Sequence, residues 1–464
     1  MKKGFNMDLS KERYKLSYYN VLHEIGDITY MWNTYANSLL ALDESGQKYI
    51  QSFSGIDDNS DEFKMLKENG FVVNERVNEF ARISSEEKQA LFSCDGGDMS
   101  VTIAPGMGCN YECSYCFQTA LSKSKGLKDM TPEIANEVAA YVCKMLKERN
   151  KKRLRVTWFG GEPLLYIDII EIISNKIFAY VHEHNIDYSA IVITNGRLLD
   201  ENAIAKLVGL GVKRVQITID GLCDVYCSSK NASPEDFRCV INNIRSAADK
   251  FTLTIRMNIS GNDAKEAIAV TNFLSSECNV LDKVVLYFAF VRDHTLETEK
   301  QAQAYIDYVR NYFLWVEHMI ERCGMSDATK YFYRPERRAT HCGIIGVGNA
   351  CIDSAGNLYR CHHGFGDTSR IIGDIWNGKY FDNAYLEYYS AIDAKKEEKC
   401  SQCKYLPIHM SGCVEHYLIG YSGFDCETYQ KLQFNLKLLT GGCNAFKKHV
   451  ESESVSDEIN KSTI

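Results

Sequence analysis

The feature that most constrains this fold is the alternation of short β-branched runs with longer amphipathic runs between residues 100 and 323. The runs expected to form strands are 100–105, 153–158, 189–194, 213–219, 251–258 and 283–290. The runs expected to form helices are 132–149, 166–185, 200–209, 235–250, 263–277 and 299–323. Repeated βα units predict a parallel sheet covered by helices. The pattern alone fits either an open doubly wound sheet or a barrel.

Segments of a different character flank this region. The β-rich and helical stretches within residues 1–90 predict a small hairpin-plus-helices module, with a polar connection at 83–88. Periodicity is lost across 331–447, where Cys, Gly and Tyr dominate, and small cysteine-dense segments usually need metal to fold. Residues 448–464 are polar and are expected to form a frayed tail. The main domain is therefore expected at 91–330.

Charge and hydropathy exclude several classes of protein. The net charge of -8 argues against a nucleic-acid partner, and no apolar run approaches the length of a membrane span. No apolar segment follows the first lysines, so we expect a cytoplasmic protein without a secretory signal. In the reducing cytoplasm, 18 cysteines indicate metal ligands and core residues rather than disulfides.

Cys109, Cys113 and Cys116 form a Cys-x3-Cys-x2-Cys array directly after the first predicted strand. Loops that follow strand ends line the active sites of parallel α/β proteins. Three thiolates can hold three irons of a four-iron four-sulfur cluster and leave the fourth iron open for an exogenous ligand. A zinc knuckle is the alternative, but no fourth Cys or His lies nearby in the sequence.

This array resembles the signature of the radical S-adenosylmethionine (SAM) superfamily, which implies a partial (β/α)6 TIM barrel that binds a catalytic cluster and SAM. In that family the aromatic residue before the last Cys packs beside the SAM adenine, and a GGEP motif receives the SAM amino group. The cofactor-binding residues implied here are Tyr115, Gly160, Gly161, Glu162, Thr194, Asn195, Thr218, Asp220 and Arg256. Relatives often carry His-Asp and Arg after the AspGly pair, whereas this chain has Tyr226, Cys227 and Lys230, to which we assign no role.

The cysteines beyond residue 340 resemble the SPASM extension of peptide-modifying radical SAM enzymes, and His409 stands where its Cys-x2-Cys-x5-Cys-x3-Cys pattern has the third Cys. The resemblance implies one or two auxiliary iron-sulfur clusters, for which two ligand sets are expected. The first set is Cys342, Cys361 and Cys413, with Cys351 as a candidate fourth ligand, and the second set is Cys400, Cys403, His409 and Cys426.

Some of these assignments have alternatives. The strand-like surroundings of Cys351 also allow a core role, and Cys443 is not expected to be a ligand. Imidazole ligates iron in some iron-sulfur centres; if His409 does not, the second cluster has an open or solvent-filled position. A pair of zinc sites is the other interpretation of this region.

The resemblance implies a maturase that abstracts hydrogen from a ribosomally made precursor peptide. The N-terminal module resembles a winged-helix element that binds leader peptides, and a reductant such as flavodoxin or ferredoxin is expected. We favour a thioether crosslink from a substrate cysteine, with formylglycine formation, as in anaerobic sulfatase maturation, and carbon-carbon cyclisation as alternatives. A non-catalytic iron-sulfur electron carrier is disfavoured because it needs no SAM site. No side chain is singled out as a catalytic base.

Overall fold

The computed structural model describes residues 12–25, 28–56, 60–92, 97–116, 118, 128–259, 264–290, 311–312, 314–315, 318–319, 337–340, 342–343, 346–379 and 398–414. Cys426, Cys443, the predicted tail and most of the predicted helix at 299–323 lie outside these residues.

The largest sheet contains six neighbouring parallel strands that follow one another in chain order. They are β6 (Asp98–Ile103), β7 (Arg153–Trp158), β8 (Asp187–Thr194), β9 (Val212–Thr218), β10 (Thr252–Ile259) and β11 (Val284–Phe290). A doubly wound sheet reverses its strand order at a switch point. Each of these strands instead pairs with its predecessor, so the sheet winds in one direction, as barrel strands do. The α/β prediction is confirmed.

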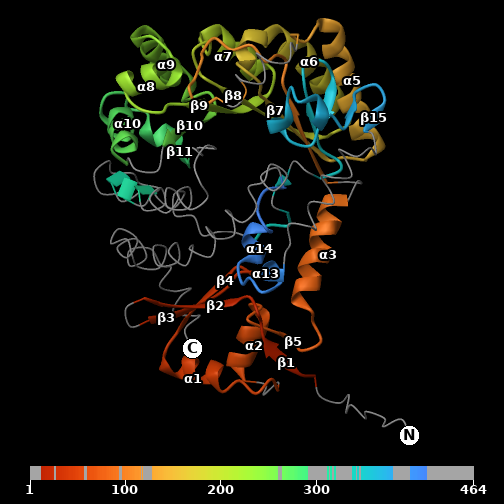
Figure 1. The fold of residues 1–464 in the computed structure, drawn as a ribbon, viewed down its shortest axis with the longest axis vertical. Helices are drawn as coiled ribbons and strands as arrows, with labels where there is room; N and C mark the ends of the chain where they lie inside the picture. Colours follow the sequence, from red (N-terminus) through yellow and green to blue (C-terminus); the bar gives the residue numbers. More distant parts are fainter. Residues whose placement is uncertain are drawn as a thin grey trace.

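Helices cover the outer side of these strands (Figure 1). The connections contain α5 (Pro132–Glu148), η1 (Pro163–Tyr166), α6 (Ile167–Glu183), α7 (Glu201–Gly209), α8 (Cys223–Lys230), α9 (Pro234–Ala247), α10 (Ala264–Ser276) and η2 (Leu281–Lys283). Several of these helices begin at a residue whose side chain caps the first turn. Thr131 accepts from the backbone N–H of Ile134 at the start of α5, and Asp200 accepts from that of Ala203 at the start of α7.

The strands present different faces to the helices and to the interior. Residues that alternate along them form one apolar core with the helices, including Val101, Val156, Val192, Val215 and Ile255. Their neighbours on the opposite face include the polar residues Thr102, Thr157, Gln216, Thr218 and Arg256. Because side chains alternate across a strand, the sequence builds a hydrophobic outer layer and a polar inner face.

Part of the cysteine-rich region continues the same sheet beyond β6. The added strands are β12 (Ala350–Ile352), β13 (Asn357–Tyr359), β14 (Gly373–Asp374) and β15 (Gly378–Lys379). β12 pairs with β6 in parallel, and the others pair antiparallel. The short helices of this region are η5 (His362–Gly364), η6 (Thr368–Arg370), α13 (Glu398–Ser401) and α14 (Leu406–His409). β12 therefore fixes the cysteine-rich region beside the strand that leads into the Cys109 loop.

The N-terminal module contains two small sheets and two helices. β1 (Tyr14–Leu16) pairs with β5 (Val72–Asn74), and β2 (Asn20–Ile25), β3 (Ile28–Asn33) and β4 (Ser38–Leu42) form an antiparallel meander. The helices are α1 (Glu44–Gln51) and α2 (Asp61–Glu68). Met31, Leu40, Phe63, Leu66 and Phe71 lie in its core. The expectation of strands and helices in this segment is confirmed.

The polar connection predicted at 83–88 is wrong, because helix α3 (Glu79–Phe92) runs through it. Its buried residues are Ile83, Glu87 and Leu91, spaced four residues apart on one face. The polar run around Glu87 concealed this helical period.

The module also contacts the segment that holds α13 and α14. Tyr19, Val21 and Trp32 of the module share a buried cluster with Cys400, Cys403, Tyr405, Leu406, Ile408 and Met410. The side chain of Thr34 donates to the carbonyl of Lys404, and Lys404 Nζ donates to the carbonyl of Asn20 at 2.9 Å. Figure 1 shows α13 and α14 between the module and the large sheet.

None of the described helices is both long and apolar enough to traverse a bilayer.

Candidate functional site

The three cysteines of the predicted cluster lie on the loop that follows β6. Cys109 is exposed, and Cys113 and Cys116 are partly exposed. Desolvation raises the pKa of Cys109 to about 11, and the charges of Glu162, Cys113 and Cys116 act in the same direction. The loop therefore gathers three sulfur atoms near one another and near Glu162.

Two backbone hydrogen bonds from the turn at Gly161 and Glu162 hold this loop. Gly161 N donates to Gly106 O at 3.2 Å, and Glu162 N donates to Gly108 O at 2.9 Å. A Cβ at Gly161 would lie 2.1 Å from Gly108 O, and one at Gly160 would lie 2.4 Å from Gly106 O. Any larger residue would push the loop away, so the Gly-Gly sequence is required for this close approach.

Glu162 is completely buried and links the ends of two strands. Its Oε1 accepts from Thr194 Oγ1 at 2.7 Å and from Leu164 N at 3.0 Å, and its Oε2 accepts from Asn195 N at 2.8 Å. Burial raises the pKa of Glu162, and these hydrogen bonds oppose the rise. In this structure Glu162 and Thr194 thus fasten the loop after β7 to the end of β8.

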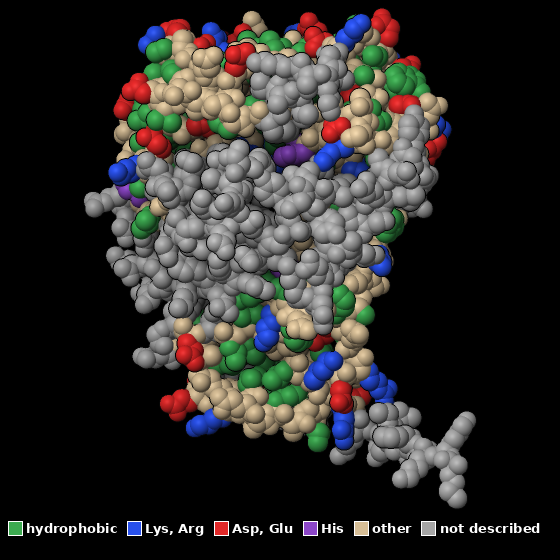
Figure 2. All heavy atoms as spheres, viewed as in Figure 1, with side chains coloured by type: hydrophobic (Ala, Val, Ile, Leu, Met, Phe, Trp, Pro, Cys, Tyr) green, Lys and Arg blue, Asp and Glu red, His purple; other side chains and the backbone are tan. Residues whose placement is uncertain are grey.

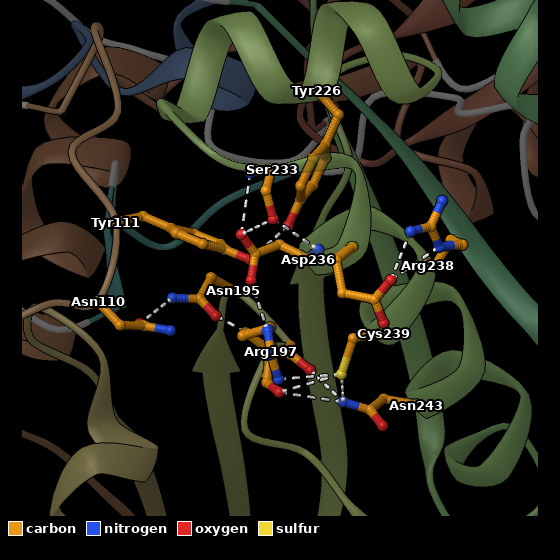
Figure 3. A network of polar contacts seen from close by, with 12 residues as sticks. Asn110, Tyr111, Asn195, Arg197, Tyr226, Ser233, Asp236, Arg238, Cys239 and Asn243 are labelled. Carbon is orange, nitrogen blue, oxygen red and sulfur yellow. Dashed lines mark hydrogen bonds and ion pairs between the residues drawn. The ribbon is translucent and has the colours of Figure 1, made fainter.

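Asn195 connects this junction to the cysteine loop (Figure 3). Its Nδ2 donates to Asn110 Oδ1 at 2.7 Å and lies 3.9 Å from Cys109 Sγ. Its Oδ1 accepts from Arg197 N at 2.9 Å. Arg197 in turn pairs with Asp236 at 2.7 Å and donates to Cys239 Sγ at 3.1 Å. The Asn195 amide is therefore oriented from both sides, with its donor group directed at the cysteine loop.

Tyr115 contacts a polar group formed by Asp220, Ser229 and Lys230. Its hydroxyl donates to Asp220 Oδ2 at 2.6 Å and accepts from Lys230 Nζ at 2.9 Å. Ser229 Oγ donates to the same carboxylate oxygen at 3.2 Å. Burial, followed by the charge of Asp220, raises the pKa of Tyr115. The group holds the neutral phenol and brings together Tyr115 and Asp220, two of the residues predicted to bind the cofactor.

Helix α8 supplies residues that the sequence analysis left without a role. In addition to Lys230 and Ser229, it carries Tyr226, which is fully buried and lies edge-on to Tyr111 of the cysteine loop. Ser114 N donates to Ser229 O at 3.0 Å. Relatives often carry Arg where this chain has Lys230. That difference was the one sequence signal that could have pointed to α8 as part of the site.

Thr218 and Arg256 are paired neighbours on β9 and β10. Arg256 Nε donates to Asn258 Oδ1 at 2.8 Å, and its guanidinium lies over the Tyr287 ring. Burial lowers the pKa of His362 to about 4, and the nearby charges of His363 and Arg256 act in the same direction. Sequence reasoning missed His362, which contacts Phe159 at a ring separation of 4.9 Å.

Three cysteines lie close enough to Cys361 for their charges to affect its pKa: Cys342, Cys351 and Cys413. Burial raises the pKa of Cys361 to about 12, and the charges of Cys351, Cys413 and Cys342 act in the same direction. Cys351 is fully buried on β12, in a small cluster with Ala104 and Met107. Its position is therefore compatible with both roles left open by the sequence, as a core residue and as a fourth ligand beside Cys361.

Cys400, Cys403 and His409 of the second set are buried, with 1%, 8% and 2% of their surfaces exposed. His409 Nε2 lies 3.4 Å from Cys403 Sγ. Burial raises the pKa of Cys403, and hydrogen bonds from the backbone N–H groups of Tyr405 and Leu406 oppose the rise. Such donors stabilise a thiolate.

The Cys109 loop has the donors and the backbone cradle that a sulfur-ligated cluster requires. Tyr111 N donates to Cys109 Sγ at 3.5 Å, and the Asn195 amide approaches the same sulfur. N–H groups directed at ligand sulfurs are among the features that tune iron-sulfur clusters. Among the described residues, no group of three His, Cys, Asp or Glu side chains is close enough to hold a single metal ion.

Comparisons with known proteins show which chains this protein resembles. Residues 103–274 match the radical SAM superfamily. A cysteine-type anaerobic sulfatase-maturating enzyme of Clostridium perfringens (strain 13 / Type A) is 23% identical over 68% of this chain and 88% of its own length. A radical SAM cyclopropyl synthase of Paramaledivibacter caminithermalis is 28% identical over 28% of this chain, a match that covers 30% of that enzyme.

A solved structure shows the same fold at low identity. The structure described as native anSMEcpe with bound AdoMet superposes with a TM-score of 0.54 at 18% identity, covering 75% of this chain and 99% of that one. The match of residues 103–274 includes the Cys109 loop, the Gly160 turn and the ends of β8 to β10. The predictions of a radical SAM domain and of a SAM-dependent enzyme are confirmed.

Proposed function

We propose that this chain, which belongs to the radical SAM superfamily, modifies a peptide or protein substrate by abstracting a hydrogen atom from it. The observation that carries the proposal is the Cys109 loop, which is fixed by Gly160, Gly161 and Asn195 at the carboxyl ends of parallel strands. The sulfatase-maturating relative, matched over most of its length, supports a substrate of this class.

Cys109, Cys113 and Cys116 would hold the catalytic four-iron four-sulfur cluster, and the polar residues at the strand ends would contact SAM. When bound, the reduced cluster and SAM supply a 5′-deoxyadenosyl radical that removes hydrogen from the substrate. The chain's own residues fix the geometry: the glycines set the loop against β7, and Asp220 and Lys230 orient Tyr115. Thr218 and Arg256 provide a hydroxyl and a cation on the polar inner face.

The cysteine-rich region would hold two auxiliary iron-sulfur sites. The proximity of Cys342, Cys351 and Cys413 to Cys361 supports the first set. The backbone donors at Cys403 support a second site. Among the described residues, Cys400 and Cys403 are its proposed ligands, and the further candidate Cys426 lies outside them. A flavodoxin or ferredoxin is the expected reductant.

The N-terminal module is the proposed binding element for a leader peptide. Its three-stranded sheet has exposed apolar side chains at Leu22 and Ile28, 55% and 46% exposed. Figure 2 shows hydrophobic side chains gathered on the visible face of the module, near the bottom of the view. Because the module contacts residues 400–410, a peptide bound there would lie beside the cysteine-rich region.

Thioether formation is the finer reaction that we propose. Joining a substrate carbon to a cysteine sulfur breaks one C–H and one S–H bond: one hydrogen atom goes to 5′-deoxyadenosine, and a proton and an electron leave. The auxiliary sites would provide an acceptor for that electron. Formylglycine formation is the second candidate, favoured by the 88% coverage of the sulfatase-maturating relative.

The decisive experiment replaces Cys109, Cys113 and Cys116 together by Ala in the full chain. Reductive production of 5′-deoxyadenosine from SAM should then disappear, while iron bound by the cysteine-rich region remains. Cys143→Ala is the matched control, because Cys143 lies on α5 and packs against the hydrophobic core. Undiminished 5′-deoxyadenosine in the triple variant would refute the proposed site.

A further inference from the structure

His409 occupies a position in the second auxiliary set where a ligand is expected, but its surroundings define which ring nitrogen carries the proton. Ser411 N–H donates to His409 Nδ1 at 3.0 Å. A neutral imidazole has one N–H group, so the nitrogen that accepts this bond is the unprotonated one. The proton therefore resides on Nε2, the nitrogen that lies 3.4 Å from Cys403 Sγ.

This tautomer does not suit iron ligation through Nε2. A ligand nitrogen must offer a lone pair, and a metal-bound histidine almost always donates its other N–H to a carboxylate, carbonyl or water. Here the other nitrogen faces a donor, so ligation through Nε2 would require loss of both ring protons.

The backbone that imposes this arrangement is unusual. Met410, Ser411 and Gly412 have φ values of 49°, 64° and 79°, so three successive residues adopt left-handed conformations, two of which are not glycine. Such conformations cost free energy and persist only where the surrounding structure enforces them. The turn is closed by Met410 N donating to Leu406 O at 2.8 Å and Gly412 N donating to His409 O at 2.9 Å. Its effect is to direct the Ser411 N–H at the imidazole.

Because His409 is buried, its remaining ring N–H group needs a hydrogen-bond acceptor. His409 and Cys403 lie beside the apolar cluster shared with Trp32, where a polar group without a partner is costly. The sulfur already has donors in the N–H groups of Tyr405 and Leu406. His409 Nε2 adds a side-chain donor to the same atom.

We infer that His409 donates its Nε2–H to the Cys403 sulfur and positions and tunes that thiolate ligand, without itself binding iron. This inference rests on the proposed second auxiliary site and assigns its fourth ligand position to another group. Because N–H donors withdraw charge from a cluster sulfur, removing this donor lowers the reduction potential of the cluster.

The test uses the full chain, reconstituted anaerobically with iron and sulfide. His409→Gln places an amide N–H near the position of Nε2, whereas His409→Met fills the space without a donor. The inference predicts equal iron per chain in the wild type and both variants, with a lower auxiliary potential in His409→Met and a nearly unchanged one in His409→Gln. Iron loss in both variants would overturn it.

A measurement on the unmutated protein gives an independent answer. With ¹⁵N-labelled histidine, pulsed paramagnetic resonance of the reduced auxiliary cluster should show only the weak nitrogen coupling of a hydrogen bond. A strong coupling typical of direct coordination would refute the inference and leave the proposed function intact. Cys400→Ala distinguishes the two, because retention of all iron in that variant would remove the second auxiliary site and this inference with it.

Discussion

The ammonium group of Lys230 lies 3.0 Å from Asp220 Oδ2, and the two side chains are only 2% and 4% exposed. The same ammonium donates to the hydroxyl of Tyr115, so the ion pair joins helix α8 and the end of β9 to the cysteine loop. Removing one partner of a buried pair leaves the other charge uncompensated.

Lys230→Met should therefore destabilise the protein by about 3–5 kcal/mol and weaken SAM binding through Tyr115. Lys230→Arg keeps the charge and should retain most of both. The measurements are thermal unfolding and the dissociation constant of SAM. In a double-mutant cycle, Asp220→Asn combined with Lys230→Met should cost less than the sum of the single changes. Additive costs would mean that the pair is not coupled.

Gly161→Ala should displace the cysteine loop, because the added Cβ would lie 2.1 Å from Gly108 O and 2.5 Å from Met107 O. We expect iron at the catalytic cluster and 5′-deoxyadenosine formation to fall at least tenfold. Gly209→Ala is the matched control: nothing lies within 4 Å of its added Cβ. The control should keep full activity and gain up to about 1 kcal/mol of stability from better helix propensity.

The sequence predicted the strands of the main sheet closely, because their buried runs are bounded by sharp changes in composition; β7 occupies 153–158 as expected. It missed α8, whose half-polar CysAspValTyrCysSerSerLys sequence has little amphipathic character. The direction of winding was also not available, because the same βα pattern serves open sheets and barrels.

Site residues that are close together in the sequence could be predicted from their spacing. Site residues whose roles depend on tertiary contacts could not. Cys109, Cys113 and Cys116, which the spacing singled out, lie on one loop, where the charges of Cys113 and Cys116 act on Cys109. In contrast, a lysine such as Lys230 ordinarily lies in solvent, and only the folded chain places it against Asp220 and Tyr115. The same applies to Glu162, whose three hydrogen bonds to its neighbours cannot be inferred from the motif.

Asp236 should make the protein's stability depend on acid pH. Hydrogen bonds from Ser233 and then from Arg197 lower its pKa from 3.8 to about 2. A carboxylate with a depressed folded pKa contributes stability that is complete above the unfolded value and is lost as pH falls from about 4 through about 2. Asp236→Asn should thus lower the unfolding temperature at neutral pH and flatten its decline over this range. Glu235→Gln, at an exposed neighbouring carboxylate, is the control and should retain the wild-type profile.

Trp32→Ala tests whether the N-terminal module supports the auxiliary region. Trp32 is 2% exposed, and its ring centroid lies 6.2 Å from that of Tyr405, in the buried cluster that joins the module's sheet to the turn carrying Cys400 and Cys403. Truncating a buried Trp typically costs about 3–5 kcal/mol, and part of that loss should appear in this turn. We therefore expect less auxiliary iron and faster proteolysis near residues 398–414, with SAM cleavage preserved. Trp376→Ala is the matched control, since Trp376 is 54% exposed. If Trp32→Ala lowered stability but left auxiliary iron and proteolysis unchanged, the module and the cysteine-rich region would be energetically independent. A leader peptide bound to the module could then not influence the cysteine-rich region through this contact.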